Sequence, residues 1–172
     1  MAADTERAQV HFDDVRVGMD IPSVVKGPMT QAHIMRWSAS QENWHRIHYD
    51  HPFALGHEKL PDVVVNGSWK QQVMCQLIKD WVGLGGWLWK INFQHRAMNV
   101  PGDTLTAWGR VTGTYEQDGL GIVLLDIGMR NQHSTEACPG RATAVLPIRG
   151  GRPVPYPFVP PPGGRIMPAS QS

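Results

Sequence analysis

Residues 66–86 read NGSWKQQVMCQLIKDWVGLGG, and this stretch decides the fold class. Its large apolar residues recur every four positions, and two further ones widen the stripe: Trp69, Val73, Leu77 and Trp81, with Met74 and Ile78. That spacing predicts an amphipathic helix whose apolar side faces the core. Asn66 or Ser68 can cap its start, and the glycines after Val82 can end it. We therefore expect a long, largely buried helix that contains Cys75 as a small buried thiol.

The chain after this helix reads as a series of strands joined by turns. Apolar patterns suited to strands cover four segments, residues 87–94, 104–116, 120–131 and 141–148. Turn-forming residues separate these segments at 100–103, 117–119 and 139–140. One long helix followed by consecutive strands predicts an α+β fold in which a curled antiparallel sheet wraps the helix. Such a sheet leaves its edge strands exposed, and pairing of those edges favours a dimer.

The two ends of the chain are less regular. Short extended pieces are expected at Val10–Phe12 and at residues 21–25. Residues 31–40 read as a helix that Thr30 can cap, and Asp50 can cap a short helix over 51–55. Prolines crowd residues 153–162 and prevent continuous sheet pairing. We expect one domain over residues 1–150 and an extended, Pro-rich tail over residues 151–172.

Composition excludes several classes of function. The 172 residues carry a net charge of +1 without a basic stripe, so nucleic acid is a poor candidate partner. No apolar run approaches the roughly 18 residues of a membrane span, and the polar N-terminus lacks the apolar core of a signal peptide. Two cysteines, Cys75 and Cys138, do not make a disulfide framework. These features predict a cytoplasmic protein.

A dense polar cluster lies before the long helix, where the chain reads NWHRIHYDH from residue 43. A metal site is one interpretation, because His45, His48 and His51 stand three apart and Asp50 adds an oxygen ligand. A proline and the predicted helix cap interrupt any single helix here, so the three rings need not share a face, and we expect no metal. Surface or helix-capping roles are a second interpretation for His45, His51 and Asp50.

General acid–base catalysis is a third interpretation of the cluster. A histidine in a half-buried loop, here His48, can move a proton to and from carbon when an amide or carboxyl group holds the substrate or water. The reaction also needs donors for a developing oxyanion. Free N–H groups at the start of the long helix, around Gly67, can supply them together with the positive end of the helix dipole.

Several motifs, in this order, resemble the MaoC-like acyl-thioester hydratases and dehydratases of the hot-dog fold. The matching pieces are Phe12–Gly18, the helix before the cluster, Asn43–Ala54, Val65–Gly67 and Val100–Leu105. The resemblance covers roughly residues 11–148. The variant motif Asn-x-His-Arg-Ile-His-Tyr-Asp is similar to that of fungal-synthase-type and mitochondrial 3-hydroxyacyl-thioester dehydratases, and of itaconyl- and mesaconyl-CoA hydratases.

The resemblance implies roles for individual residues. The family's catalytic histidine falls on His48, its oxyanion glycine on or beside Gly67, and its catalytic aspartate on Asn43. The asparagine and proline of the family motif fall on His45 and Arg46. An asparagine cannot titrate, although it can hold a water or a substrate carbonyl.

We therefore expect a hydratase or dehydratase that interconverts 2-enoyl and 3-hydroxyacyl thioesters of CoA or acyl carrier protein, without a cofactor. His48 would carry the proton, Asn43 would orient the water or hydroxyl group, and the N–H near Gly67 would stabilise the enolate. The expected substrate-binding residues are Asn66, Ser68, Asp50 and Trp44. The chain would act as a homodimer or in a hetero-oligomer with another hot-dog chain.

Two alternatives remain open from the sequence. Because Asn43 replaces the acid, the chain can instead be a non-catalytic or half-site subunit of a two-chain hydratase. A hot-dog acyl-CoA thioesterase is the other alternative, with Glu42 or Asp50 serving the hydrolysis.

Overall fold

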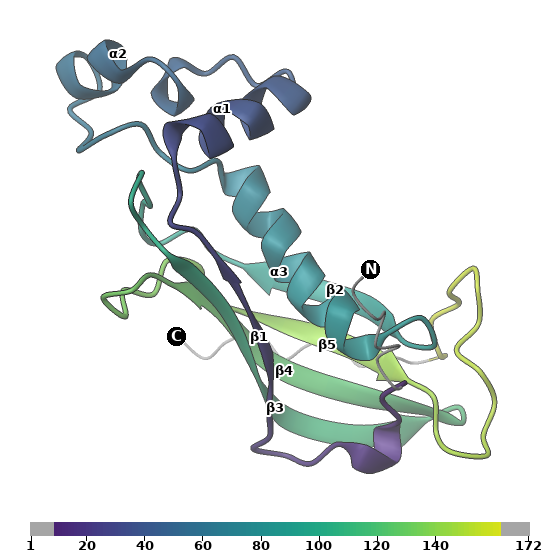
Figure 1. Cartoon of the computed structure of the whole chain (residues 1–172). Coiled ribbons are helices and arrows are strands. Elements are labelled where there is room, and N and C mark those ends of the chain that lie inside the picture. The colour runs from purple at the N-terminus through teal and green to yellow at the C-terminus, as the bar shows by residue number, and fades with distance from the viewer. Residues whose placement is uncertain (1–8, 163–172) are drawn as a thin grey trace, which may run out of the picture.

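The computed structural model describes residues 9–162 of the chain. Its elements, in chain order, are η1 (Phe12–Asp14), β1 (Asp20–Lys26), α1 (Gln31–Ser40), η2 (Arg46–His48), α2 (His51–Gly56), α3 (Gly67–Val82), β2 (Trp87–Phe93), β3 (Leu105–Gln117), β4 (Leu120–Arg130) and β5 (Gly140–Leu146). The strands form one antiparallel sheet in the order β1-β3-β4-β5-β2. The sheet curls around α3, which lies across its inner face (Figure 1). This is the α+β fold that the sequence predicts.

The main core fills the space between α3 and the sheet. The predicted apolar stripe of the helix supplies one side of it, and Met74, Leu77 and Ile78 have no exposed surface. Strand residues such as Leu125 and Ile127 supply the other side, each only 1% exposed. Truncating a side chain buried to this degree costs about 2–5 kcal/mol of folding free energy, so this packing fixes the position of α3.

The opposite side of α3 does not face the sheet, and here one expectation was wrong. Cys75 is partly exposed rather than buried, because it lies beside the apolar stripe of the helix and not on it. It lines a cavity of about 810 Å³ together with residues of β2 and residues 154–156. The helix is therefore buried along its stripe and not on all sides.

Both ends of α3 follow from particular residues. Gly83 ends the helix with a positive φ of 68°, and its N–H donates to the carbonyl of Lys79 at 3.2 Å. Asn66 occupies the N-cap position, but its side chain makes no capping hydrogen bond. Ser68 lies inside the helix rather than at its cap. The first N–H groups of α3 thus remain uncapped by these side chains.

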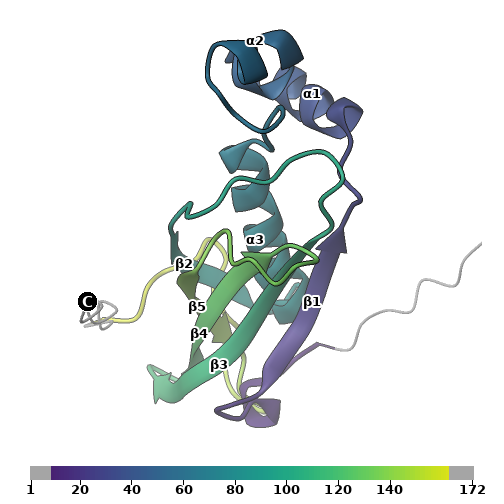
Figure 2. The ribbon, with the colours of Figure 1, turned by 90° about the vertical axis from the view of Figure 1, so that its left-hand side faces the viewer.

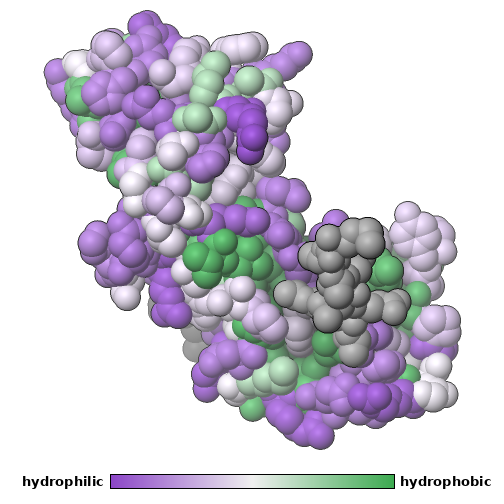
Figure 3. Space-filling view, viewed as in Figure 1, coloured by the Kyte–Doolittle hydropathy of each residue, from purple (hydrophilic) through white to green (hydrophobic). Residues whose placement is uncertain are grey.

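A helical lobe of α1, η2 and α2 lies beyond the sheet, at the N-terminal end of α3 (Figures 1 and 2). The space-filling surface narrows between this lobe and the sheet (Figure 3). The caps predicted at Thr30 and Asp50 are confirmed: Thr30 accepts from the N–H of His33 at 3.2 Å, and Asp50 accepts from the N–H of Phe53 at 3.0 Å. Within residues 9–162, no helix has both the length and the apolar character needed to cross a bilayer.

The N-terminal segment corrects a second expectation. The extended piece predicted at residues 21–25 is confirmed as part of β1, whereas Val10–Phe12 does not form a strand. Phe12 instead begins the 3-10 helix η1, and its N–H donates to the carbonyl of Pro147 at 3.0 Å. The other two residues of η1, Asp13 and Asp14, accept hydrogen bonds from Arg149. These contacts anchor the segment at the end of β5, where no free strand edge is available.

Residues 151–162 form no strand, as their prolines predict, but they pack against the outer face of the sheet. Phe158 stacks on Trp87 with ring centroids 5.7 Å apart, and both contact a second apolar cluster of Leu120, Ile122 and Val145.

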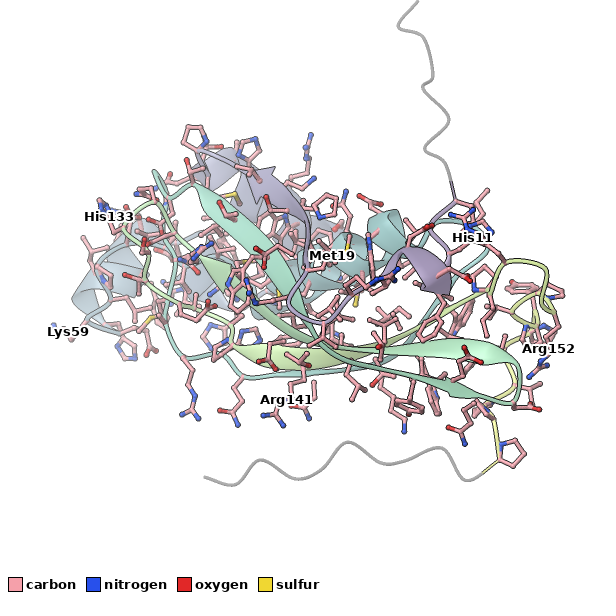
Figure 4. All side chains as sticks on the ribbon, turned by 90° about the horizontal axis from the view of Figure 1, so that it is seen from below. His11, Met19, Lys59, His133, Arg141 and Arg152 are labelled. Atoms are coloured by element: carbon pink, nitrogen blue, oxygen red, sulfur yellow. The ribbon has the colours of Figure 1, made fainter. Side chains whose placement is uncertain are left out.

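Figure 4 shows His11 and Arg152 near this end of the molecule, and Lys59 and His133 near the end that carries α2. The remaining tail, residues 163–172, lies outside the described residues.

Candidate active site

His48 is held at the end of η2, against the segment that leads into α3. Only 8% of the residue is exposed, and its Nδ1 lies 2.8 Å from the carbonyl oxygen of Val64. The N–H of Val64 donates in turn to the carbonyl of Ile47 at 3.0 Å, which fixes η2 to this segment. The position of the imidazole is therefore set by backbone contacts on both sides.

The contact with Val64 determines which nitrogen of His48 can act as a base. A carbonyl oxygen only accepts hydrogen bonds, so Nδ1 must carry a proton, and in the neutral ring Nε2 holds the free lone pair. Burial lowers the pKa of His48 below its ordinary value of 6.5, opposed by the hydrogen bond to Val64 and aided by nearby His45. The ring is thus neutral near pH 7, with Nε2 available to take a proton.

The start of α3, three residues after Val64, offers free hydrogen-bond donors. Within residues 9–162, the N–H groups of Gly67, Ser68 and Trp69 have no hydrogen-bond acceptor. The positive end of the helix dipole adds to their attraction for a negative oxygen. Gly67 follows Val64 by three residues, which an extended chain spans in at most about 11 Å. One short segment therefore holds both the base and the oxyanion donors.

Asn66 and Ser68 connect this segment to α1. The amide of Asn66 donates to Ser38 Oγ at 2.9 Å, and Ser68 Oγ accepts from Trp37 Nε1 at 2.9 Å. Asn66 is only 1% exposed, yet its Oδ1 has no partner among the described residues. A buried oxygen without a partner is the kind of group that a bound substrate or water satisfies.

Asn43 begins the cluster and is half-buried. Its Oδ1 accepts from the N–H of His45 at 3.2 Å, and its own N–H donates to the carbonyl of Ser38 at 2.9 Å. The preceding residue, Glu42, has a positive φ of 51°, which turns the chain from α1 into the cluster. Within residues 9–162, Asn43 Nδ2 makes no hydrogen bond, so it is available to a ligand.

The structure places Asp50 and Trp44 in other contacts. The Asp50 carboxylate accepts from Phe53 N–H and from the Arg46 guanidinium at 2.7 Å, and the bond to Arg46 holds its pKa below the usual range. Trp44 is 61% exposed, and its carbonyl accepts from the Tyr49 hydroxyl at 2.7 Å. Asp50 thus serves as an ionised helix cap, and substrate binding by either residue stays a prediction.

The other histidines of the cluster diverge from His48. The His45 ring centroid is 6.1 Å from that of His48, and His51 begins α2 with its Nε2 3.7 Å from Asp62. In the part of the chain that the structure describes, no three His, Cys, Asp or Glu side chains are grouped to hold a metal ion.

Sequence reasoning missed a second polar group at the start of α3. The His95 ring lies against Gly67, the Lys70 ammonium donates to the carbonyl of Ala97 at 2.9 Å, and Cys138 contacts His95. Lys70 is only 3% exposed, and burial lowers its pKa despite its attraction to Cys138 and Asp103. One signal was available, since Lys70 falls on the apolar stripe of the helix.

A cavity of about 530 Å³ lies between α1, the end of β1 and α3. Trp37, Trp69 and Val73 give it an apolar wall, and Lys26 and Arg36 add positive charge. It adjoins the first turn of α3, because Trp37, which lines it, donates a hydrogen bond to Ser68 Oγ. Neither this cavity nor the one beside Cys75 is lined by Asn43, His48 or Gly67. The base and donors are thus joined by a backbone segment, not by a shared cavity in this chain alone.

Solved structures show the same fold. The (R)-hydratase from A. caviae involved in PHA biosynthesis superposes with a TM-score of 0.68 at 22% identity, over 78% of this chain and 98% of that chain. A MaoC-like dehydratase from Rhodospirillum rubrum gives 0.70 at 18%, over 81% and 98%. A chain of the ChsH1-ChsH2 complex from Mycobacterium tuberculosis gives 0.65 at 19%, over 76% and 98%. The predicted hot-dog fold is therefore confirmed.

A family model identifies the sequence more specifically. No curated protein matches the chain. The model of the family described as hydroxyacyl-thioester dehydratase type 2 matches residues 14–101, slightly more than half of the chain. The matched range includes Asn43, His48 and Gly67, and it supports a hydratase or dehydratase activity. The chain belongs to the hydroxyacyl-thioester dehydratase type 2 family, with the MaoC-like hot-dog fold that its motifs resemble.

Proposed function

We propose that the protein is a hydro-lyase that interconverts 2-enoyl and 3-hydroxyacyl thioesters, with CoA as the carrier. One observation carries this proposal. The Val64 carbonyl fixes the neutral His48 ring, and Val64 itself lies only three residues before Gly67, at the uncapped start of α3. A base and a set of oxyanion donors are the two elements that removal of a proton next to a thioester requires.

In the hydration direction, Asn43 holds a water molecule and His48 Nε2 takes its proton as the oxygen attacks C3 of the enoyl thioester. The electron pair of the C2–C3 double bond moves to form an enolate, whose oxygen accepts hydrogen bonds at the start of α3. His48 then returns the proton to C2, which yields the 3-hydroxyacyl thioester. Dehydration follows the same steps in reverse. The thioester itself acidifies C2, so the scheme requires no cofactor.

Two further residues support substrate binding in this scheme. The unpaired Oδ1 of Asn66 can accept a hydrogen bond from a water or substrate group at the start of α3. Ser68 is bonded to Trp37, so it links the donors to the 530 Å³ cavity. The apolar wall and positive rim of that cavity suit an acyl or pantetheine chain attached to a phosphate-bearing carrier.

The test uses the purified full-length protein with crotonyl-CoA and with longer and branched enoyl-CoAs. Loss of the enoyl absorbance, without release of free thiol, is the expected result. Release of free CoA without loss of the enoyl group would instead identify the thioesterase. That alternative is weakened by the Asp50 carboxylate, which Arg46 and Phe53 already occupy. No reaction with any thioester, alone or with a second hot-dog chain, would end the proposal.

A half-site subunit is the second candidate, and the amide at Asn43 favours it, because it cannot share the proton transfer with His48. The ChsH1-ChsH2 neighbour is a complex of two chains. The free edges of β1 and β2 are available for pairing with another chain. Full activity of the purified homo-oligomer would exclude this candidate, whereas activity only with a second hot-dog chain would establish it. The cytoplasmic location stays a prediction.

A further inference from the structure

His95 lies directly over the first residue of α3. It belongs to the loop between β2 and β3, which arches past the N-terminal part of the helix (Figure 2). A Cβ atom placed on Gly67 would lie 3.0 Å from His95 Nε2 and 3.3 Å from its Cε1. The Nε2 corner of the ring therefore lies against the first residue of α3, and the missing side chain of Gly67 leaves the space that the ring occupies.

The strand register explains why His95 meets Cys138. In the antiparallel pairing of β2 with β5, Phe93 lies opposite Gly140. The ladder continues beyond the strands, because Gln94 N–H donates to the carbonyl of Pro139 at 3.0 Å. The next pair in this register is His95 and Cys138, and Nδ1 lies 3.5 Å from Sγ. The contact thus follows from the sheet and is not an accident of a loose loop.

A second ring fixes the orientation of His95. Phe93 meets it edge to face, with ring centroids 5.4 Å apart and an interplanar angle of 81°. The following residue is held as well, because Arg96 N–H donates to the carbonyl of Ala137 at 2.8 Å. The ring is therefore positioned before any substrate arrives, as a hydrogen-bond donor in an oxyanion site needs to be.

The contact with Cys138 bears on the tautomer of His95. Cys138 has no exposed surface, and burial raises the pKa of its thiol, with Glu136 acting in the same direction and Lys70 against it. The thiol therefore keeps its proton near pH 7 and can donate it in a hydrogen bond to Nδ1 of His95, which lies 3.5 Å away. Partial burial, aided by the charge of Lys70, lowers the pKa of His95, so its ring is neutral. A neutral ring that accepts at Nδ1 carries its proton on Nε2.

We propose that His95 Nε2–H donates a hydrogen bond to the thioester oxygen beside the N–H of Gly67, and that the Cys138 thiol holds His95 in the required tautomer. His95 is then a catalytic residue and Cys138 a positioning residue. No proton is transferred by either group, since both only stabilise the charge that develops on the enolate oxygen. The inference rests on the proposed function, because it assigns a further donor to the same site.

The test compares kcat and KM for crotonyl-CoA hydration among four variants of the full chain. His95→Phe keeps an aromatic ring beside Phe93 but removes the donor, and we expect kcat to fall about 100- to 1000-fold with little change in KM. His95→Gln keeps an N–H donor and is expected to recover part of that loss. A role in packing alone would give the opposite order, with Phe tolerated better than Gln.

Two substitutions of Cys138 test its role in positioning His95. Cys138→Ser keeps a donor to Nδ1 and is expected to retain kcat within about threefold, whereas Cys138→Ala loses the tautomer control and is expected to lower kcat about tenfold. Thermal unfolding of every variant separates these effects from loss of the fold.

Two outcomes would overturn the inference in different ways. Unchanged kcat in His95→Phe, in a protein whose activity depends on His48, removes the role of His95 and leaves the proposed function standing. A wild-type protein without hydratase activity removes both. Equal kcat for Cys138→Ser and Cys138→Ala would contradict the positioning role of the thiol.

Discussion

Two histidines approach the start of α3 from different parts of the fold, His48 from the helical lobe and His95 from the loop between β2 and β3. Nδ1 of His48 meets a carbonyl oxygen, whereas Nδ1 of His95 meets a thiol. The carbonyl accepts a hydrogen bond from Nδ1–H of His48, and the protonated thiol donates one to Nδ1 of His95, so the two Nε2 atoms acquire opposite characters. The partner of Nδ1, not the histidine itself, therefore decides whether the ring acts as a base or as a hydrogen-bond donor.

The largest expected effect comes from removing the base. His48→Ala leaves the donors at Gly67 and His95 in place but removes the group that carries the proton. We expect kcat for enoyl-CoA hydration to fall about 100- to 10,000-fold. His51→Ala is the matched control, because His51 lies three residues away on the surface, with its Nε2 3.7 Å from Asp62. Steady-state rates decide, and similar rates in the two variants would contradict the assignment of the base.

The pH dependence of the rate tests whether His48 is the base. A base works only when neutral, and burial lowers the pKa of His48 below 6.5. We therefore expect kcat/KM to reach a plateau by about pH 7.5 and to fall about tenfold per pH unit well below a midpoint that lies under 6.5. A midpoint above 6.5 would show that the group responsible is not a buried neutral imidazole.

The same shift has a consequence for stability. Because the unfolded chain binds a proton at His48 more readily than the folded chain, its contribution to the free energy of unfolding is complete above pH 6.5. That contribution is lost as the pH falls through the lower pKa of the folded state. Urea unfolding at a series of pH values measures it, and His48→Ala should have a smaller pH dependence in this range.

Gly67→Ala tests the close approach of His95. The added methyl would lie 3.0 Å from Nε2, so the ring must shift by a few tenths of an ångström. We expect kcat to fall roughly threefold, since misplacement of about 1 Å can cost up to 100-fold and this shift is smaller, without loss of thermal stability. Gly56→Ala is the control, because nothing lies within 4 Å of the atom it adds. Equal rates in the two variants would show that His95 has no function at this position.

The smallest expected change comes from Asn43→Asp, which restores the acid of the family motif. A nearby carboxylate favours the protonated imidazole, so the acid limb of the kcat/KM profile should move to higher pH. The pH profile of the variant measures this shift. An unchanged profile would place residue 43 too far from His48 to share its chemistry.

Local rules predicted the fold well. The stripe of α3, the caps at Thr30 and Asp50, and the two-residue turn at Asp118 and Gly119 follow from residue spacing and turn preference. Both turn residues have positive φ values, 52° and 67°, as a tight hairpin requires. The Val10–Phe12 prediction failed because contacts with Pro147 and Arg149, far along the chain, outweighed local preference.

The candidate site was predictable only in part, for the same reason. His48 and Gly67 belong to motifs that are short and continuous in sequence, so their resemblance to a family was visible. His95 and Cys138 are 43 residues apart and meet only because β2 pairs with β5 in one particular register. A shift of that register by one residue would move either side chain to the other face of the sheet. Neither residue could therefore be assigned before the strands were paired.

The most direct measurement is the ¹⁵N chemical shifts of the His48 and His95 rings in the free, full-length protein above pH 7. The shifts report which nitrogen of each ring carries the proton. We expect the proton on Nδ1 in His48 and on Nε2 in His95, with both rings neutral. The same tautomer in both rings, or a protonated ring at either position, would contradict it.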